Sequence, residues 1–378
     1  MKLLFAPDSF KGTLSAEKVC AVLTDKAKKR IKGVLCVSMP VADGGEGLVN
    51  ALYHACGGAL IEAVVRGPLG NPVKARYAVL KDGTAAVEMS SASGITLLSK
   101  AELDPMKSST FGTGELITDA LSRGCKKIIL GLGGSATNDG GMGIGAALGI
   151  RYLDESGNEL EPCGKNAGLV ARVDASGLSE KLRETQIVIA CDVDNPLCGE
   201  NGASAIYGPQ KGATPEQVLE LDSGLANLCS VMERACGKTL MNVSGMGAAG
   251  GMALPLAAFL NAKMERGLDI VLNAQGFDGY CEKADLIITG EGRTDQQSAM
   301  GKVVSGVAQR AQKAGKPVIV LSGALAEGCE KLYTMGVTAM FSCYTGAWPI
   351  EWQLEHAEEA LAFAAEQLFA AMEAVRGG

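Results

Sequence analysis

The run KIILGLGGSATNDGGMG, residues 127–143, joins a short apolar segment to a turn in which six of the last thirteen residues are glycine. The apolar segment does not alternate with polar residues, which is typical of a strand covered on both faces. A glycine-rich turn directly after such a strand lets the backbone approach a neighbour or a ligand closely. The run therefore predicts a buried strand that ends in a turn suited to binding.

The same pattern of a short apolar segment followed by a polar turn recurs at residues 2–7, 34–40, 186–191, 285–289, 317–321 and 337–343. Segments with a helical spacing of apolar residues lie between many of them, at residues 13–30, 46–56 and 355–375. Strands that alternate with helices indicate an α/β fold with a largely parallel sheet.

Residues 60–98 interrupt this alternation. Three strand-like runs follow one another there, and Asp-Gly at residues 82–83 separates two of them, which is a hairpin signal. An antiparallel meander within a parallel arrangement predicts that a second α/β domain is inserted into the first. We place the discontinuous first domain at residues 1–58 and 284–378, and the inserted domain with its hairpins and glycine-rich turn at 59–283.

Composition and charge argue against several classes of protein. The chain has 378 residues and a net charge of −7, so it lacks the basic field that holds nucleic acid. No apolar run is long enough for a membrane span, and the twelve cysteines are scattered without a C-x-x-C pair, which favours a cytoplasmic protein with reduced thiols. Because the chain has only two histidines, we expect a catalytic base to be a carboxylate or a lysine.

Five of the predicted turns combine glycine with charged or polar side chains, at residues 8–12, 42–47, 133–141, 192–195 and 290–295. In parallel α/β sheets ligands bind beyond the carboxyl ends of the strands, so these turns predict one shared site. Each turn alone also fits ordinary turn chemistry or a helix cap. Together, their carboxylates, cations and backbone N–H groups suit a phosphate and an oxygen nucleophile.

The glycine-rich turn at residues 131–143 is a candidate phosphate loop, because N–H groups between a strand and a helix can point at phosphate oxygens. The chain has no G-x-x-x-x-G-K-[ST] motif and therefore no Walker A loop. Ala136 stands where a dinucleotide-binding G-x-G-x-x-G motif needs its third glycine, so that match is weak.

Six stretches resemble the bacterial type I glycerate kinases in order and spacing: APDSFKG at 6–12, ADGGEG at 42–47, GGSATNDGG at 133–141, CDVDNPL at 191–197, YGPQKGA at 207–213 and TGEGRTD at 289–295. The resemblance implies phosphorylation of D-glycerate by ATP with Mg²⁺, usually to 2-phosphoglycerate. It implies a discontinuous flavodoxin-like domain, an inserted α/β domain and an active site in the cleft between them. It also implies small-molecule partners and a monomer or homodimer. Tyr207 departs from the pattern, which has phenylalanine there.

With this resemblance, the chemistry of phosphoryl transfer assigns roles to individual residues. The candidates for catalysis are Asp192 as the base, Asp43 as its rival and Lys11 as a neutralising charge. The candidates for substrate binding are Ser9, Arg293, Asp194 and Asn195, of which Asp194 is also a rival base. The candidates for nucleotide binding are Gly133, Gly134, Ser135, Thr137 and Asn138. The candidates for metal binding are Asp139 and Glu291.

Other functions stay open at this point. The enzyme could form 3-phosphoglycerate or phosphorylate another small hydroxy acid, since no motif indicates the length of the substrate's carbon chain. The chain could also be a non-catalytic α/β protein that senses a sugar acid, although such a protein needs no base. A NAD-dependent dehydrogenase is a weaker alternative, because its glycine fingerprint is incomplete.

Overall fold

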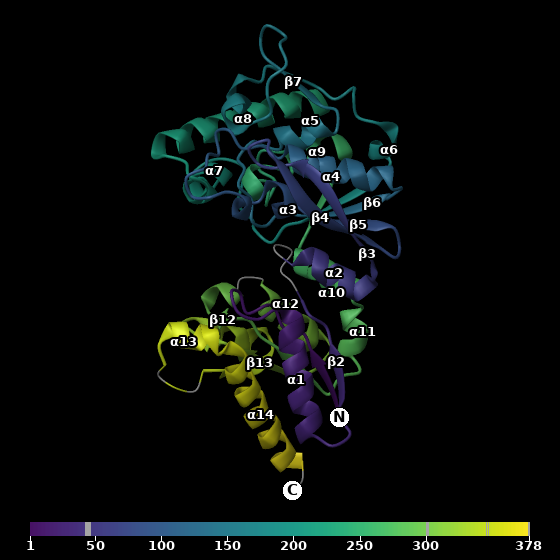
Figure 1. Ribbon diagram of the computed structural model, residues 1–378, viewed down its shortest axis with the longest axis vertical. Helices are drawn as coiled ribbons and strands as arrows, with labels where there is room; N and C mark the ends of the chain where they lie inside the picture. Colours follow the sequence, from purple (N-terminus) through teal and green to yellow (C-terminus); the bar gives the residue numbers. More distant parts are fainter. Residues whose placement is uncertain (42–46, 300–301, 345, 347, 377–378) are drawn as a thin grey trace. The chain divides into compact units, whose positions relative to one another are not determined.

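The computed structural model describes residues 1–41, 47–299, 302–344, 346 and 348–376 (Figure 1). The chain forms two compact units. The first consists of Met1–Asp43 and Leu268–Gly378, and the second of Gly44–Gly267.

The first unit contains a five-stranded sheet with the order β15-β13-β11-β1-β2. Its strands are β1 (Lys2–Phe5), β2 (Leu35–Ser38), β11 (Leu286–Thr289), β13 (Val318–Ser322) and β15 (Val337–Ser342). All neighbouring strands are parallel. Numbered as the chain reaches them, they lie in the order 2-1-3-4-5, which is that of flavodoxin-like sheets. The α/β class with parallel strands, predicted from the apolar runs, is confirmed.

Helices cover both faces of this sheet, because its strands carry apolar side chains on both sides. Helices α1 (Ala16–Arg30) and α14 (Ala357–Arg376) lie side by side (Figure 1) and bury Leu3 of β1. Helix α12 (Val303–Lys313) forms a second apolar cluster with Val320 of β13. The unit also contains α10 (Gly267–Ala274), α11 (Phe277–Cys281), the short parallel pair β12 (Arg293–Thr294) and β14 (Ala324–Leu325), and α13 (Ile350–Glu355).

The second unit contains a six-stranded sheet with the order β10-β9-β6-β5-β4-β3. Its strands are β3 (Gly58–Arg66), β4 (Pro72–Leu80), β5 (Thr84–Glu88), β6 (Lys127–Gly131), β9 (Gln186–Ala190) and β10 (Lys263–Glu265). Strands β3, β4 and β5 are antiparallel, whereas β5, β6, β9 and β10 are parallel. The meander predicted within residues 60–98 is therefore present. Gly83, at its second turn, has a φ of +82°, which glycine adopts without strain.

The core of the second unit lies between this sheet and its helices, and includes Leu130, Ile144, Leu228 and Leu256. The helices are α2 (Leu48–Cys56), α3 (Ser90–Ser93), α4 (Phe111–Ser122), α5 (Met142–Ala147), α6 (Glu180–Arg183), α7 (Ala203–Tyr207), α8 (Pro215–Cys236) and α9 (Leu254–Leu260). A small antiparallel pair, β7 (Arg151–Leu153) and β8 (Arg172–Asp174), completes the unit.

Side-chain caps fix where two of the long helices begin. Ser15 Oγ accepts a 3.2 Å hydrogen bond from the backbone N–H of Lys18 at the start of α1. At the start of α8, Thr214 and Gln217 form a reciprocal capping box, in which each side chain bonds the backbone N–H of the other.

The limits of the two compact units differ from the expected domain boundaries, which lie at residues 58/59 and 283/284. Helix α2 contacts β4 and β5 and so groups with the second unit, while α11 contacts α12 and groups with the first. Within the described residues, no helix combines the length and the apolar character that crossing a membrane requires.

Candidate functional site

In the first unit, polar residues follow the neighbouring strands β1 and β11. The chain leaves β1 toward β2 on one side and returns at β11 on the other, so the strand order reverses between them. Ligands of such sheets bind outside the carboxyl ends of the strands at this switch point. Asp8, Ser9 and Lys11 follow β1 there, and Glu291 and Arg293 follow β11.

The two loops at this switch point are in close contact. The backbone N–H of Asp8 donates a 2.9 Å hydrogen bond to the carbonyl of Gly290. A Cβ on Gly292 would lie 3.3 Å from Phe10 Cα and 3.4 Å from the backbone nitrogen of Lys11, so a side chain at this position would crowd the β1 loop. The structure therefore brings the candidate-bearing loops after β1 and β11 together.

Ser9 is held in place by Asp8. The Asp8 side chain is buried, and its Oδ1 accepts hydrogen bonds from the Ser9 backbone N–H at 2.7 Å and from Ser9 Oγ at 3.4 Å. A buried carboxylate that orients a neighbouring hydroxyl fixes the direction in which that hydroxyl meets a ligand.

Glu291 is half-buried, and burial raises the pKa of its carboxyl above the ordinary value, while Ser298, Lys302 and Thr294 oppose the shift. The Thr294 hydroxyl lies 3.3 Å from Glu291 Oε1, and it is also 2.7 Å from Ser322 Oγ. A carboxylate in such surroundings can accept a proton or help to hold a cation.

Arg293 is exposed, with 69% of its side chain accessible, and its Nε lies 3.4 Å from Asp295 Oδ2. An ion pair this exposed contributes little to stability, so the guanidinium can exchange Asp295 for an anionic ligand at small cost. Lys11 is exposed at the same edge of the sheet. Asp43 lies outside the described residues.

In the second unit, candidates follow the neighbouring strands β6 and β9. Gly133, Gly134 and Ser135 follow β6, where Gly134 is exposed and has a φ of +73°. A Cβ on Gly134 would lie 3.2 Å from Ser90 Cβ, beyond the end of β5. Backbone N–H groups in such a loop suit an anion.

The residues after β9 are oriented by bonds to other segments of the second unit. Asp192 and Asp194 are exposed. Asp192 Oδ1 accepts a 3.1 Å hydrogen bond from the backbone N–H of Gly267. Asp194 Oδ1 accepts a 3.0 Å hydrogen bond from Ser244 Oγ. Asn195 donates to the carbonyl of Asn201 at 2.9 Å. Its Oδ1 accepts a 2.7 Å bond from the Tyr207 hydroxyl.

The later half of the glycine-rich stretch is buried. Thr137 and Asn138 are fully inaccessible, and Asn138 Nδ2 donates to Ser204 Oγ at 3.0 Å. A Cβ on Gly141 would lie 2.5 Å from the carbonyl oxygen of Met252, so this glycine allows two backbones to touch. The stretch thus has an accessible part at 133–135, in which Gly134 is exposed and its two neighbours are half-buried, and a packed part that continues to α5.

Asp139 does not fit the metal-binding role. Its Oδ2 accepts bonds from Thr110 N and Oγ1, both at 2.8 Å, and from Gly143 N at 3.0 Å, while Oδ1 accepts from Gly141 N at 3.1 Å. Burial raises the pKa of this carboxyl, and these hydrogen bonds oppose the shift. With four donors inside the fold, the carboxylate braces the starts of α4 and α5. No group of three or more His, Cys, Asp or Glu side chains suited to a metal ion occurs in the part of the chain that the structure describes.

Lys211, a residue of the YGPQKGA stretch, is a candidate that the sequence pattern does not indicate. Its side chain is only 1% exposed, and its Nζ donates a 2.6 Å hydrogen bond to the carbonyl of Thr137. Burial lowers the pKa of the ammonium to about 7, and Asp139 partly offsets the shift. A lysine before a glycine normally indicates a solvated turn, so only its place in a family-like motif could have indicated a role.

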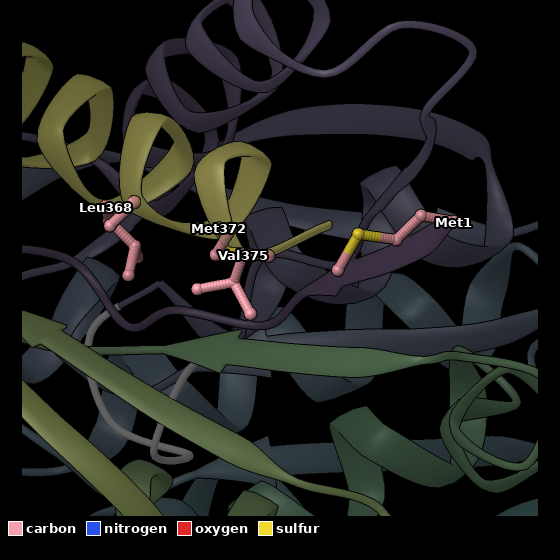
Figure 2. A pocket seen from close by; sticks show the side chains of 5 residues that line it. Met1, Leu368, Met372 and Val375 are labelled. Carbon is pink, nitrogen blue, oxygen red and sulfur yellow. The ribbon is translucent and has the colours of Figure 1, made fainter. Parts of the chain in front are cut away.

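An apolar pocket lies elsewhere in the first unit. It is lined by Met1, Leu368, Ala371, Met372 and Val375, between the start of the chain and the end of α14 (Figure 2). None of these side chains can bind a phosphate or a carboxylate, so the pocket is not a candidate for the chemistry discussed here.

Comparison with known proteins shows the family of the chain. The sequence matches the profile of the "Glycerate kinase family" over residues 3–373. It is 45% identical over 360 residues to a glycerate kinase of Bacillus subtilis (strain 168), covering 95% of this chain and 94% of that one. It is 44% identical over 346 residues to the glycerate 2-kinase of Escherichia coli (strain K12), covering 91% of each.

Among solved structures, the chain is similar to a crystal structure from Salmonella typhimurium LT2 described as glycerate kinase 2. The TM-score is 0.89 at 40% sequence identity, and the match covers 100% of both chains. Because the profile spans nearly the whole chain and the relatives match over nine-tenths of their length, the chain belongs to the glycerate kinase family.

Proposed function

We propose that the protein phosphorylates D-glycerate with ATP on the 2-hydroxyl, giving 2-phospho-D-glycerate and ADP. The observation that carries this proposal is its 44% identity, over 91% of each chain, to a protein named glycerate 2-kinase. The residues that follow β1, β11, β6 and β9 also support the proposal. They include carboxylates, cations and backbone N–H donors, which are the groups that phosphoryl transfer needs.

In the proposed reaction the oxygen of the 2-hydroxyl attacks the γ-phosphorus of ATP. The bond from that phosphorus to the bridging oxygen breaks, ADP leaves with the electron pair, and the hydroxyl proton passes to a carboxylate. We assign this base to Asp192, whose exposed carboxylate is oriented by the N–H of Gly267. Asp194 is a rival on the same loop, and Asp43 is a second rival.

The carboxylate of glycerate needs a positively charged partner in the protein. Arg293 supports this role, because a guanidinium can bind a carboxylate through two parallel hydrogen bonds. Lys11 and Ser9, at the end of the adjacent strand, are assigned to charge neutralisation and to a hydrogen bond with the substrate. Asn195, held by Tyr207, is assigned to the substrate hydroxyls.

We assign the nucleotide phosphates to the backbone N–H groups of Gly133, Gly134 and Ser135, which belong to the accessible part of the glycine-rich stretch. Thr137 and Asn138 are buried, so their contribution is to hold that loop. Mg²⁺ neutralises phosphate charge in reactions of this kind. Glu291 stays a candidate ligand for it, and Asp139 does not.

Phosphorus NMR of the purified protein with ATP, MgCl₂ and D-glycerate tests the proposal. We expect a new phosphomonoester resonance that coincides with added 2-phosphoglycerate and grows as ADP appears. A resonance that coincides with 3-phosphoglycerate would keep the kinase and reject the 2-hydroxyl. Intact ATP with D-glycerate and with a panel of other hydroxy acids would reject the kinase and favour the sugar-acid sensor.

A further inference from the structure

One short segment of the second unit, which we name the 203–211 segment, contacts both candidate loops of that unit. It consists of α7 and the single helical turn Pro209–Lys211. Ser204 Oγ accepts from Asn138 Nδ2 at 3.0 Å, Lys211 Nζ donates to the Thr137 carbonyl at 2.6 Å, and the Tyr207 hydroxyl donates to Asn195. The segment thus bonds the glycine-rich stretch after β6 and the loop after β9.

Lys211 is the basic member of this segment, and its backbone is tightly fixed. Its N–H bonds the carbonyl of Gly208 at 3.0 Å. The following Gly212 has a φ of +95°, and a Cβ there would collide with the carbonyl oxygen of Leu103. A lysine held in this way delivers its Nζ to one point with little freedom, unlike a surface lysine.

The backbone that Lys211 bonds carries two side chains whose hydrogen bonding is incomplete. Thr137 Oγ1 and Asn138 Oδ1 are buried and form no hydrogen bond within the described part of the chain. On the other side, a Cβ on Gly250 would collide with the Thr137 carbonyl oxygen, so the backbone is packed directly against this carbonyl. In an incompletely bonded buried network, the hydrogen bond from Lys211 Nζ restricts the position of the Thr137 backbone.

We propose that Lys211 is a positioning residue that fixes loop 133–135, to which we assign the nucleotide phosphates, by anchoring the Thr137 carbonyl behind it. Lys211 touches no ligand in this role. It acts through the backbone of Thr137, which lies two residues after the loop. The inference deepens the proposed function, since it rests on the assignment of the nucleotide phosphates to this loop.

The test compares K211M and K211Q with wild type. Methionine keeps the length of the apolar stem and removes the donor, whereas glutamine keeps an N–H donor on a side chain that is one bond shorter. K238M is the matched control. Lys238 also belongs to the second unit and donates at 2.9 Å to the backbone carbonyls of both Ala257 and Ala258, but at the end of α9. Circular dichroism checks that each variant is folded.

Calorimetric titration with ADP and steady-state kinetics are the two readouts. We expect K211M to raise the Kd for ADP and the KM for ATP about tenfold or more, and to change the KM for D-glycerate less than about twofold. K211Q should lie between K211M and wild type, and K238M should match wild type in all three constants.

An ADP Kd of K211M within about twofold of wild type would overturn the inference. An equal rise in the KM of both substrates, or loss of the folded state in both Lys211 variants, would also overturn it, because Lys211 would then be a general folding residue. Wild type that binds ADP but transfers no phosphate to D-glycerate would reject the proposed function alone. The ADP titrations of the variants would still test the loop.

Discussion

The hydroxyl of Tyr207 donates a 2.7 Å hydrogen bond to Asn195 Oδ1, across the space between α7 and the loop after β9. Phenylalanine, the residue that the resemblance leads us to expect at this position, could not form this bond. It orients a side chain that we assign to substrate binding.

Replacing Tyr207 with phenylalanine removes one neutral hydrogen bond and little else. Such a bond contributes about 0.5–1.5 kcal/mol, so we expect Y207F to raise the KM for D-glycerate by about two- to tenfold and to leave the KM for ATP unchanged. Y280F, which alters an exposed tyrosine on α11, is the control. A glycerate KM equal to that of wild type would show that Asn195 needs no orientation by Tyr207.

Replacing Asp192 with asparagine tests the assigned base. The amide keeps the acceptor for the Gly267 N–H but cannot take a proton, so we expect kcat to fall about 100-fold or more at unchanged ADP affinity. D194N is the comparison on the same loop. If D194N loses the greater share of kcat and D192N stays near wild type, the assignment to Asp192 is wrong.

Replacing Arg293 with alanine removes the proposed partner of the glycerate carboxylate. We expect the KM for D-glycerate to rise about tenfold or more, because a charge-assisted contact is lost, while the protein melts at the wild-type temperature. R172A, at an exposed arginine of β8, serves as control. An unchanged glycerate KM in R293A would reject the role.

Replacing Asp139 with asparagine tests whether this residue stabilises the fold or binds a metal ion. Asparagine cannot accept bonds from all four donors that surround Asp139, so we expect the free energy of unfolding to fall by about 2–4 kcal/mol. D25N, which breaks an exposed pair with Lys29, should cost little. A variant with wild-type stability but a raised Mg²⁺ requirement would restore the metal-binding role.

The pKa of Lys211, lowered by burial from 10.5 to about 7, predicts a pH dependence of stability. Between these two values the unfolded chain keeps the proton and the folded chain has lost it, so the free energy of unfolding rises with pH. Below about pH 7 both states are protonated, and the destabilisation from the buried charge is at its full size.

Wild type should therefore gain stability relative to K211M from pH 7 upward, by at most about 1.4 kcal/mol per pH unit. Asp139, whose carboxyl has its pKa raised by burial, is present in both proteins. Denaturant unfolding followed by circular dichroism between pH 6.5 and 9 measures the difference. A difference that does not change with pH would mean that Lys211 keeps its proton in the folded state.

Much of the fold could be predicted from the sequence, because strand formation depends on local patterns of apolar residues. The unbroken apolar runs of β6, β9 and β11 occur only where both faces of a strand are covered, and Asp-Gly at residues 82–83 indicates a hairpin by local backbone preference. The limits of the compact units differ from the expected domain boundaries, because they depend on which neighbours α2 and α11 contact.

The candidate site was also predictable only in part. The sequence by itself determined that Ser9, Asp192, Glu291 and Arg293 follow strands, since that depends only on the order of residues along the chain. Only the tertiary structure decided that Gly134 is exposed while Asp139 is buried with four donors, and that Lys211 reaches Thr137. Burial and long-range hydrogen bonds depend on segments distant in the chain, and a glycine-rich stretch has the same composition whether it meets a ligand or another backbone.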